Sequence, residues 1–189
     1  MSDLWQQTKD AMPRAKRLGL AGAAFGLLGI GAALLPQIGW VGLDGDMALV
    51  LAGWGAVGVG FARVVRPIPE WRGFALFFAG LLLAGVAAVI TGHVDLNGLA
   101  MLVILGLLAH GILSVLFGLR VSGRLEGWRG VVASGLCALG VGLFMIVGWP
   151  DRSVRLVGLL LGVTFLATAL ALILLAFSLP NGLDAPPRR

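Results

Sequence analysis

A similar apolar segment occurs three times in this chain, and each copy is long enough to cross a lipid bilayer. The copies begin at Arg17, Arg72 and Arg129, and each contains a glycine–leucine pair with a further glycine five positions after the first. They repeat about every 55 residues, which is the length of one helical hairpin that spans a bilayer twice. The sequence therefore predicts three repeated helical hairpins.

The composition agrees with a lipid-embedded protein. The mean hydropathy is +0.99, and 59% of the residues are hydrophobic while 12% are charged. In soluble domains, about a quarter of all residues are charged. The basic residues lie in short segments beside the apolar runs, so nucleic acid is not expected as a partner. We predict an all-α, polytopic membrane protein with one compact domain.

Six stretches have the length of about 20 residues that the hydrocarbon core demands of a helix. The predicted spans are Leu18–Leu35, Met47–Val65, Gly73–Thr91, Leu96–Leu119, Val131–Gly148 and Val154–Leu179. They form a six-helix domain over 17–179, with repeats 17–65, 72–119 and 129–179. Residues 1–16 are expected to be either a short surface helix or a frayed basic tail, and residues 180–189 a disordered tail. Pro36 is expected to end the first helix, because proline has no N–H.

The basic residues also predict the orientation. Lys and Arg collect before the first span, in the second and fourth connections and in the C-terminal tail, whereas the opposite loops hold only Arg152 and Arg155 among several aspartates. Because positively charged loops stay in the cytoplasm, both termini are expected to be cytoplasmic in a bacterial inner membrane. Trp54 falls inside the second span and is expected to pack within the bundle.

The 30 glycines of this apolar chain need a reason. Membrane helices associate through close van der Waals contact, which small residues permit. The recurring pairs therefore predict the faces by which the odd-numbered helices pack, at Gly26, Gly31, Gly80, Gly85, Gly135 and Gly140. On this basis Gly80→Leu is expected to destabilise the bundle more than Leu81→Ala.

One ionisable residue, His110, lies in the middle of a predicted span. An ionisable group at that depth indicates a functional role by default. A neutral imidazole is also satisfied by a hydroxyl group of its own or a neighbouring helix. The candidate partners are Ser114, Ser134, Thr164 and Thr168. The sequence leaves open whether His110 is structural or handles protons.

A second group of ionisable residues lies at the outer boundary. His93 and Asp95, with Asp44 and Asp46 in the preceding outer loop, form a candidate pH sensor. The alternative is that the aspartates cap the helices that follow them, with Asp44 or Asp46 before Met47 and Asp95 before the fourth span.

Nothing in the sequence predicts catalysis. The single cysteine, Cys137, lies in an apolar run, and too few ligand side chains converge to form a metal site. There is no Ser–His–Asp arrangement, no glycine-rich phosphate loop and no cysteine pair. We expect no enzyme activity, no cofactor and no metal.

Two segments begin with the same tripeptide, Trp71-Arg72-Gly73 and Trp128-Arg129-Gly130, and a third begins with the diverged Arg17-Leu18-Gly19. Each runs through Gly-Leu-x-x-x-Gly. This arrangement resembles the HdeD family of bacterial acid-resistance membrane proteins over about Arg17 to Leu179. The resemblance implies a six-helix inner-membrane protein linked to survival at low pH or high cell density, with no catalytic residues to carry over. The second hairpin departs from the pattern, because it has Thr-Gly-His where the others have proline.

The expected function is that of a non-enzymatic stress-response protein, acting through membrane integrity or partner proteins. Two alternatives stay open: a small permease or channel for a neutral or protonated solute, and an accessory subunit of a larger membrane complex. The expected partners are the lipid bilayer and either a membrane protein or a second copy of this chain.

Overall fold

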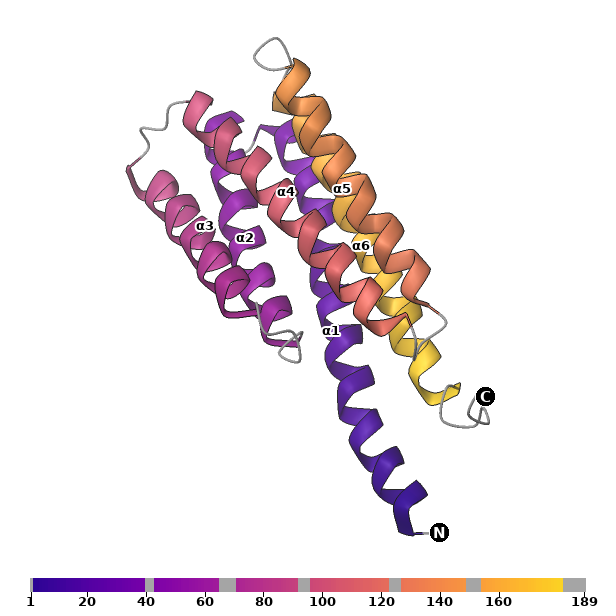
Figure 1. Cartoon of the computed structure of the whole chain (residues 1–189). Coiled ribbons are helices and arrows are strands. Elements are labelled where there is room, and N and C mark those ends of the chain that lie inside the picture. Colours follow the sequence, from indigo (N-terminus) through magenta and orange to yellow (C-terminus); the bar gives the residue numbers. More distant parts are fainter. Residues whose placement is uncertain are drawn as a thin grey trace.

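The computed structural model describes residues 2–39, 43–64, 71–91, 96–122, 127–148 and 154–181, with side chains over 16–39, 45–63, 71–91, 98–122, 127–148 and 155–178. Its elements in these ranges are the helices α1 (Ser2–Ile38), α2 (Leu43–Val64), α3 (Trp71–Thr91), α4 (Leu96–Val121), α5 (Trp128–Gly148) and α6 (Val154–Asn181). All six are long and apolar enough to cross a membrane. The described part of the chain is therefore all-helical, with the architecture of a multi-pass membrane protein (Figure 1).

Four helix ends match the predicted spans to the residue, and the start of α2 differs in an informative way. Helices α4 and α6 begin, and α3 and α5 end, at the predicted residues. Helix α2 begins at Leu43, four residues before the predicted Met47. Asp46 therefore lies in the first helical turn instead of preceding the helix as a cap. A carboxylate is still favourable there, because the first turn carries the positive end of the helix dipole.

Helix α1 differs most from its predicted span. Residues 2–16 continue α1 without a break and extend past the rest of the bundle (Figure 1). Pro36 does not end this helix, which continues to Ile38. The helix ends at Gly39, whose φ is 64° and whose N–H donates to the Leu35 carbonyl over 3.0 Å. Glycine ends helices in this way because it adopts the left-handed conformation without a steric penalty.

The predicted boundary between the helical domain and the C-terminal tail is also wrong. Helix α6 continues to Asn181, so the first two residues of the predicted disordered tail are helical. Residues 182–189 lie outside the described residues.

The six helices divide into inner and outer ones. The buried share of the even-numbered spans α2, α4 and α6 is 50–56%, whereas that of the odd-numbered spans α1, α3 and α5 is 17–33%. The inner helices carry most of the buried polar side chains, including Asp46, His110, Ser114, Thr164 and Thr168. Polar groups are costly in lipid, which explains why the helices that carry them lie inside.

The most extensive contacts join α1 to α6, α2 to α3 and α4 to α5. The first and last helices of the chain thus lie side by side (Figure 1). Each of these pairs joins helices that belong to different predicted hairpins. The threefold repetition of hairpins stays a prediction from the sequence.

Glycines bring the backbones together in each pair. A Cβ atom at Gly29 would stand 3.0 Å from the Gly162 carbonyl oxygen, and one at Gly162 would stand 2.8 Å from the Gly29 oxygen. Gly111 of α4 and Gly135 of α5 meet in the same reciprocal way, with both distances at 2.8 Å. In the α2–α3 pair, Gly85 lies against the backbone of Ala52.

The predicted glycine faces are therefore partly corrected. Gly85 and Gly135 lie in these close contacts, and Gly26 faces Ala169 at 3.7 Å. Gly80 and Gly140 have nothing within 4 Å of an added Cβ, and Gly31 meets only Leu35 of its own helix. The reason is helical geometry: residues five positions apart point about 140° away from each other, because each residue turns the helix by about 100°. One glycine of each pair therefore faces a neighbour while the other faces outward.

Because Gly80 faces outward, the predicted order of Gly80→Leu and Leu81→Ala reverses. Leu81 is 2% exposed, whereas Gly80 is exposed and has open space around it. Leu81→Ala should therefore be the more damaging change.

We predict opposite outcomes for alanine at Gly85 and at Gly80. Gly85→Ala should destabilise the protein by about 1–3 kcal/mol, because the added methyl group meets the Ala52 backbone, which cannot move aside cheaply. Gly80→Ala serves as the control and should be neutral or slightly stabilising, because alanine favours helix. Thermal unfolding in detergent, followed by circular dichroism, measures both. Equal shifts would contradict the helix contact assigned to Gly85.

Candidate functional site

His110 lies in a cluster of aromatic rings near the middle of α4. Its side chain is fully buried. Five ring centroids surround the imidazole centroid at 5.1–6.5 Å, contributed by four other helices. These rings belong to Phe25 of α1, Trp54 and Phe61 of α2, Phe78 of α3 and Phe165 of α6. We call this group, together with His110, the His110 cluster.

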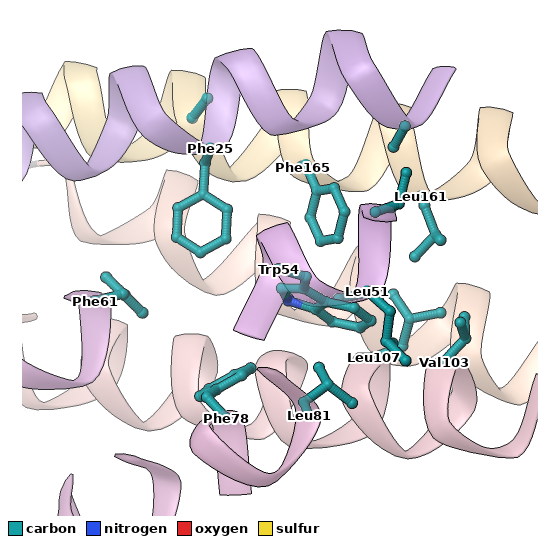
Figure 2. Close-up of a cluster of buried hydrophobic side chains, with 14 of the residues drawn as sticks. Phe25, Leu51, Trp54, Phe61, Phe78, Leu81, Val103, Leu107, Leu161 and Phe165 are labelled. Atoms are coloured by element: carbon teal, nitrogen blue, oxygen red, sulfur yellow. The ribbon is translucent and has the colours of Figure 1, made fainter. Parts of the chain in front are cut away.

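The rings of the cluster also pack against one another. Trp54 and Phe165 meet edge to face with centroids 5.0 Å apart, and Phe25 and Phe61 do so at 5.6 Å. Figure 2 shows these side chains converging from several helices on the middle of the bundle. Edge-to-face pairs of this kind stabilise a core beyond the area that they bury.

Glycines on the inner helices make room for the rings. A Cβ atom at Gly106, one turn before His110, would stand 2.6 Å from the Trp54 ring. Gly58 of α2 lies in the same way against the Phe78 ring. These glycines therefore allow large rings to reach the His110 cluster while the helices stay close.

One hydrogen bond holds the imidazole and favours one of its tautomers. The Thr168 hydroxyl donates its proton to the Thr164 carbonyl of its own helix over 3.0 Å. The same oxygen lies 3.1 Å from His110 Nε2. Because the only hydroxyl proton is already donated, the oxygen accepts at this second contact, and Nε2–H is the donor. In the neutral ring, Nδ1 then carries a lone pair and no proton.

Three buried polar atoms in this region have no hydrogen-bond partner: His110 Nδ1, Trp54 Nε1 and Ser114 Oγ. Trp54, His110 and Ser114 are each 0% exposed. His110 and Ser114 are separated by one turn of α4, so they lie on the same side of that helix. Buried polar groups in proteins are nearly always paired, so these three atoms are unusual in the described core.

The surroundings of His110 are uncharged. Its ring contacts and its hydrogen bond involve phenylalanine, tryptophan and threonine side chains. None of these side chains ionises at ordinary pH. Of the two interpretations of His110, the contacts favour the structural one. Thr168 is the partner among the four hydroxyl residues that the sequence proposed.

The predicted outer site is only partly described. His93 and Asp95 lie outside the described residues, although α4 begins at Leu96, directly after Asp95. The side chain of Asp44 is also outside them, whereas Asp46 is fully buried. The sequence did not predict this burial, because Asp46 was assigned to an outer loop.

The described residues contain no group of three or more His, Cys, Asp or Glu side chains that could hold a metal ion. Cys137 is exposed on α5. Sequence reasoning also missed the four phenylalanines of the His110 cluster. Phenylalanine is common in apolar helices, so its position along one helix does not show which rings from other helices it will meet.

No family model, curated protein or solved structure matches this chain. The geometry of the His110 cluster and the sequence motifs are therefore the grounds for a functional proposal.

We predict that the His110–Thr168 hydrogen bond stabilises the bundle. Thr168→Val keeps the shape of the side chain but leaves Nε2–H without an acceptor, so the free energy of unfolding should fall by about 0.5–2 kcal/mol. Thr164→Val is the matched control, because the buried Thr164 hydroxyl donates to the Leu160 carbonyl of its own helix. Thermal unfolding in detergent compares the two, and an equal loss in both variants would count against the hydrogen bond.

Proposed function

We propose that this protein is a non-enzymatic protein of the bacterial inner membrane that supports survival under acid or related stress, through the bilayer or through partner proteins. The observation that carries the proposal is the closed middle of the bundle. The five rings that surround His110 are each no more than 1% exposed. They fill the level at which a solute path would have to cross, so the interior groups serve to hold the helices together.

The sequence motifs behind the acid-stress part of the proposal form a recurring local structure. Each Trp-Arg-Gly motif begins a helix, α3 or α5. The Arg72 guanidinium carbon lies 5.9 Å from the Trp71 ring centroid, and that of Arg129 lies 5.8 Å from Trp128. Tryptophan and arginine together suit the boundary between lipid and water. These are the residues that carry the resemblance to the HdeD family.

The proposed orientation has both termini in the cytoplasm. Helix α1 begins and α6 ends at the same end of the bundle (Figure 1). Four exposed arginines lie near helix ends, and a fifth lies where the apolar part of α1 begins: Arg63, Arg72, Arg120 and Arg129, then Arg17. The positive-inside rule assigns them to the cytoplasmic side.

A second candidate function is a permease for a small neutral solute. The unpartnered atoms of His110, Trp54 and Ser114 favour it, because they provide hydrogen-bonding groups halfway across the membrane. Unlike the first proposal, this one requires the aromatic rings to move aside during transport.

We predict that deleting the gene lowers survival after acid challenge, and that a plasmid copy of the wild type restores it. Cys137→Ser should restore survival equally well, because that side chain is exposed on an outer helix and contributes nothing to the His110 cluster. Colony counts after a timed exposure to low pH measure the effect. Survival of the deletion strain at the parental level would contradict the stress proposal.

Purified protein in liposomes separates the two candidate functions. Under the first proposal, the uptake of small neutral solutes across a pH gradient proceeds no faster than in empty liposomes. Faster uptake that Trp54→Phe alters would support the permease instead.

A further inference from the structure

Two connections of the chain repeat the same pattern of charge. One joins α2 to α3 and the other joins α4 to α5, and the four helix ends concerned lie at one end of the bundle (Figure 1). In the sequence, each connection with its two helix ends holds three arginines and one glutamate: Arg63, Arg66, Glu70 and Arg72, then Arg120, Arg124, Glu126 and Arg129. Each connection therefore keeps an excess of positive charge.

The arginines at these helix ends are exposed and belong to helices that pack against each other. We call Arg63 and Arg72 the α2–α3 arginine pair, and Arg120 and Arg129 the α4–α5 arginine pair. A Cβ atom at Gly118 would stand 3.2 Å from the Trp128 carbonyl oxygen, so the backbones of α4 and α5 are in contact at this level. Like charges at adjoining helix ends repel each other, and an anion beside them lowers that repulsion.

The other end of the bundle differs in charge. Asp46, the only acidic residue whose side chain the structure describes, lies in the first turn of α2, at the opposite end of that helix from Arg63. The two arginine pairs thus share one end of the bundle, and this end is complementary to negative charge.

A tryptophan lies beside one arginine of each pair. The Arg72 guanidinium carbon is 5.9 Å from the Trp71 ring centroid, and that of Arg129 is 5.8 Å from Trp128. Both distances are within the range of about 6 Å for a cation–π contact. Because tryptophan in membrane proteins collects at the level of the lipid headgroups, these guanidinium groups lie where phospholipids carry their phosphates.

Exposed leucines continue the side of each helix that carries its arginine. Spacings of four, seven, eleven and fourteen residues return to nearly the same side of an α-helix. Leucines 57–74% exposed occur at these spacings after Arg72 and Arg129, namely Leu76 and Leu83 on α3, and Leu136 and Leu143 on α5. A cationic group next to an apolar strip matches a phospholipid, whose phosphate lies next to its acyl chains.

We propose that each arginine pair, with its neighbouring tryptophan, binds one bilayer phospholipid whose headgroup has a net negative charge. The phosphate accepts hydrogen bonds from the guanidinium groups, whose planar fork suits phosphate oxygens, and an acyl chain lies along the exposed leucines. A zwitterionic headgroup binds less strongly, because its cationic group is repelled by the same arginines. The inference requires only that the helices cross a bilayer, so it stands independently of the proposed stress function.

Native mass spectrometry of the full chain in a neutral detergent tests these sites. The probes are dioleoyl phosphatidylglycerol, which is anionic, and dioleoyl phosphatidylcholine, which is zwitterionic. We expect two phosphatidylglycerol molecules to be retained more strongly than phosphatidylcholine. Equal retention of the two lipids by the wild-type chain would overturn the proposal, and this comparison needs no substitution.

Substitutions assign the sites to the arginine pairs. Arg72→Gln and Arg129→Gln should each weaken one of the two binding events about fivefold, because a basic residue near an anionic lipid surface contributes about 1 kcal/mol. Arg155→Gln is the control, since this exposed arginine lies at the start of α6, at the other end of the bundle. A loss of the same size in the Arg155→Gln variant, or no loss in the first two, would contradict the sites.

Glycerol 3-phosphate distinguishes a lipid site from a site for soluble phosphates. It carries a phosphate group but no acyl chains. If the sites bind lipid, millimolar glycerol 3-phosphate leaves phosphatidylglycerol bound. Displacement of the lipid at that concentration would show that the arginine pairs select a free phosphate, and it would overturn the proposal.

Discussion

Close approach of helix backbones is the constraint on which the rest of this structure depends. Lipid tails are as apolar as the side chains, so exclusion from the solvent does not drive helices together, and van der Waals fit has to do so. Glycine permits that fit in three places, where α1 meets α6, α2 meets α3 and α4 meets α5. The residues concerned include Gly22, Gly29, Gly158 and Gly162, then Gly55 and Gly85, then Gly111, Gly118 and Gly135. Phe25 lies one turn from Gly29, and Phe165 lies one turn from Gly162, so the close approach of α1 and α6 also brings these two rings of the His110 cluster together.

The polar part of the core is small and costly, and this limits what the protein can do. His110 is held by one hydrogen bond to Thr168 and enclosed by five rings. None of the described side chains that contact the imidazole is a carboxylate with which it could exchange a proton. Helix packing is therefore a more economical account of these residues than acid–base chemistry.

The sequence predicted the positions of the membrane spans but not how the helices pair, and the reason is physical. Span positions follow from hydropathy, which is a local property, and four helix ends agree to the residue. Helix α1 ends at Gly39 and not at Pro36, and Gly39 lies beyond the apolar run that marked the span. The recurring glycine pairs predicted the packing faces only in part, because two residues five positions apart on a helix face different directions. The pairing of α1 with α6 and the assembly of the phenylalanines around His110 depend on which faces meet across the bundle, and no single helix encodes that. His110 itself was recognisable from its depth, and Thr168 was one of four candidates.

The contact between α1 and α6 is the part of this arrangement that can be tested most directly. A Cβ atom at Gly26 would stand 3.7 Å from the Ala169 Cβ atom, which is within the range of about 3.5–4.5 Å that disulfides require. In a Cys137→Ser background, oxidation of the Gly26→Cys, Ala169→Cys double variant should give an internal cross-link within the monomer. The Gly31→Cys, Ala169→Cys variant, whose first position faces outward, should give none. Absence of the internal cross-link in the first variant, or its formation in both, would contradict the arrangement on which the His110 cluster depends.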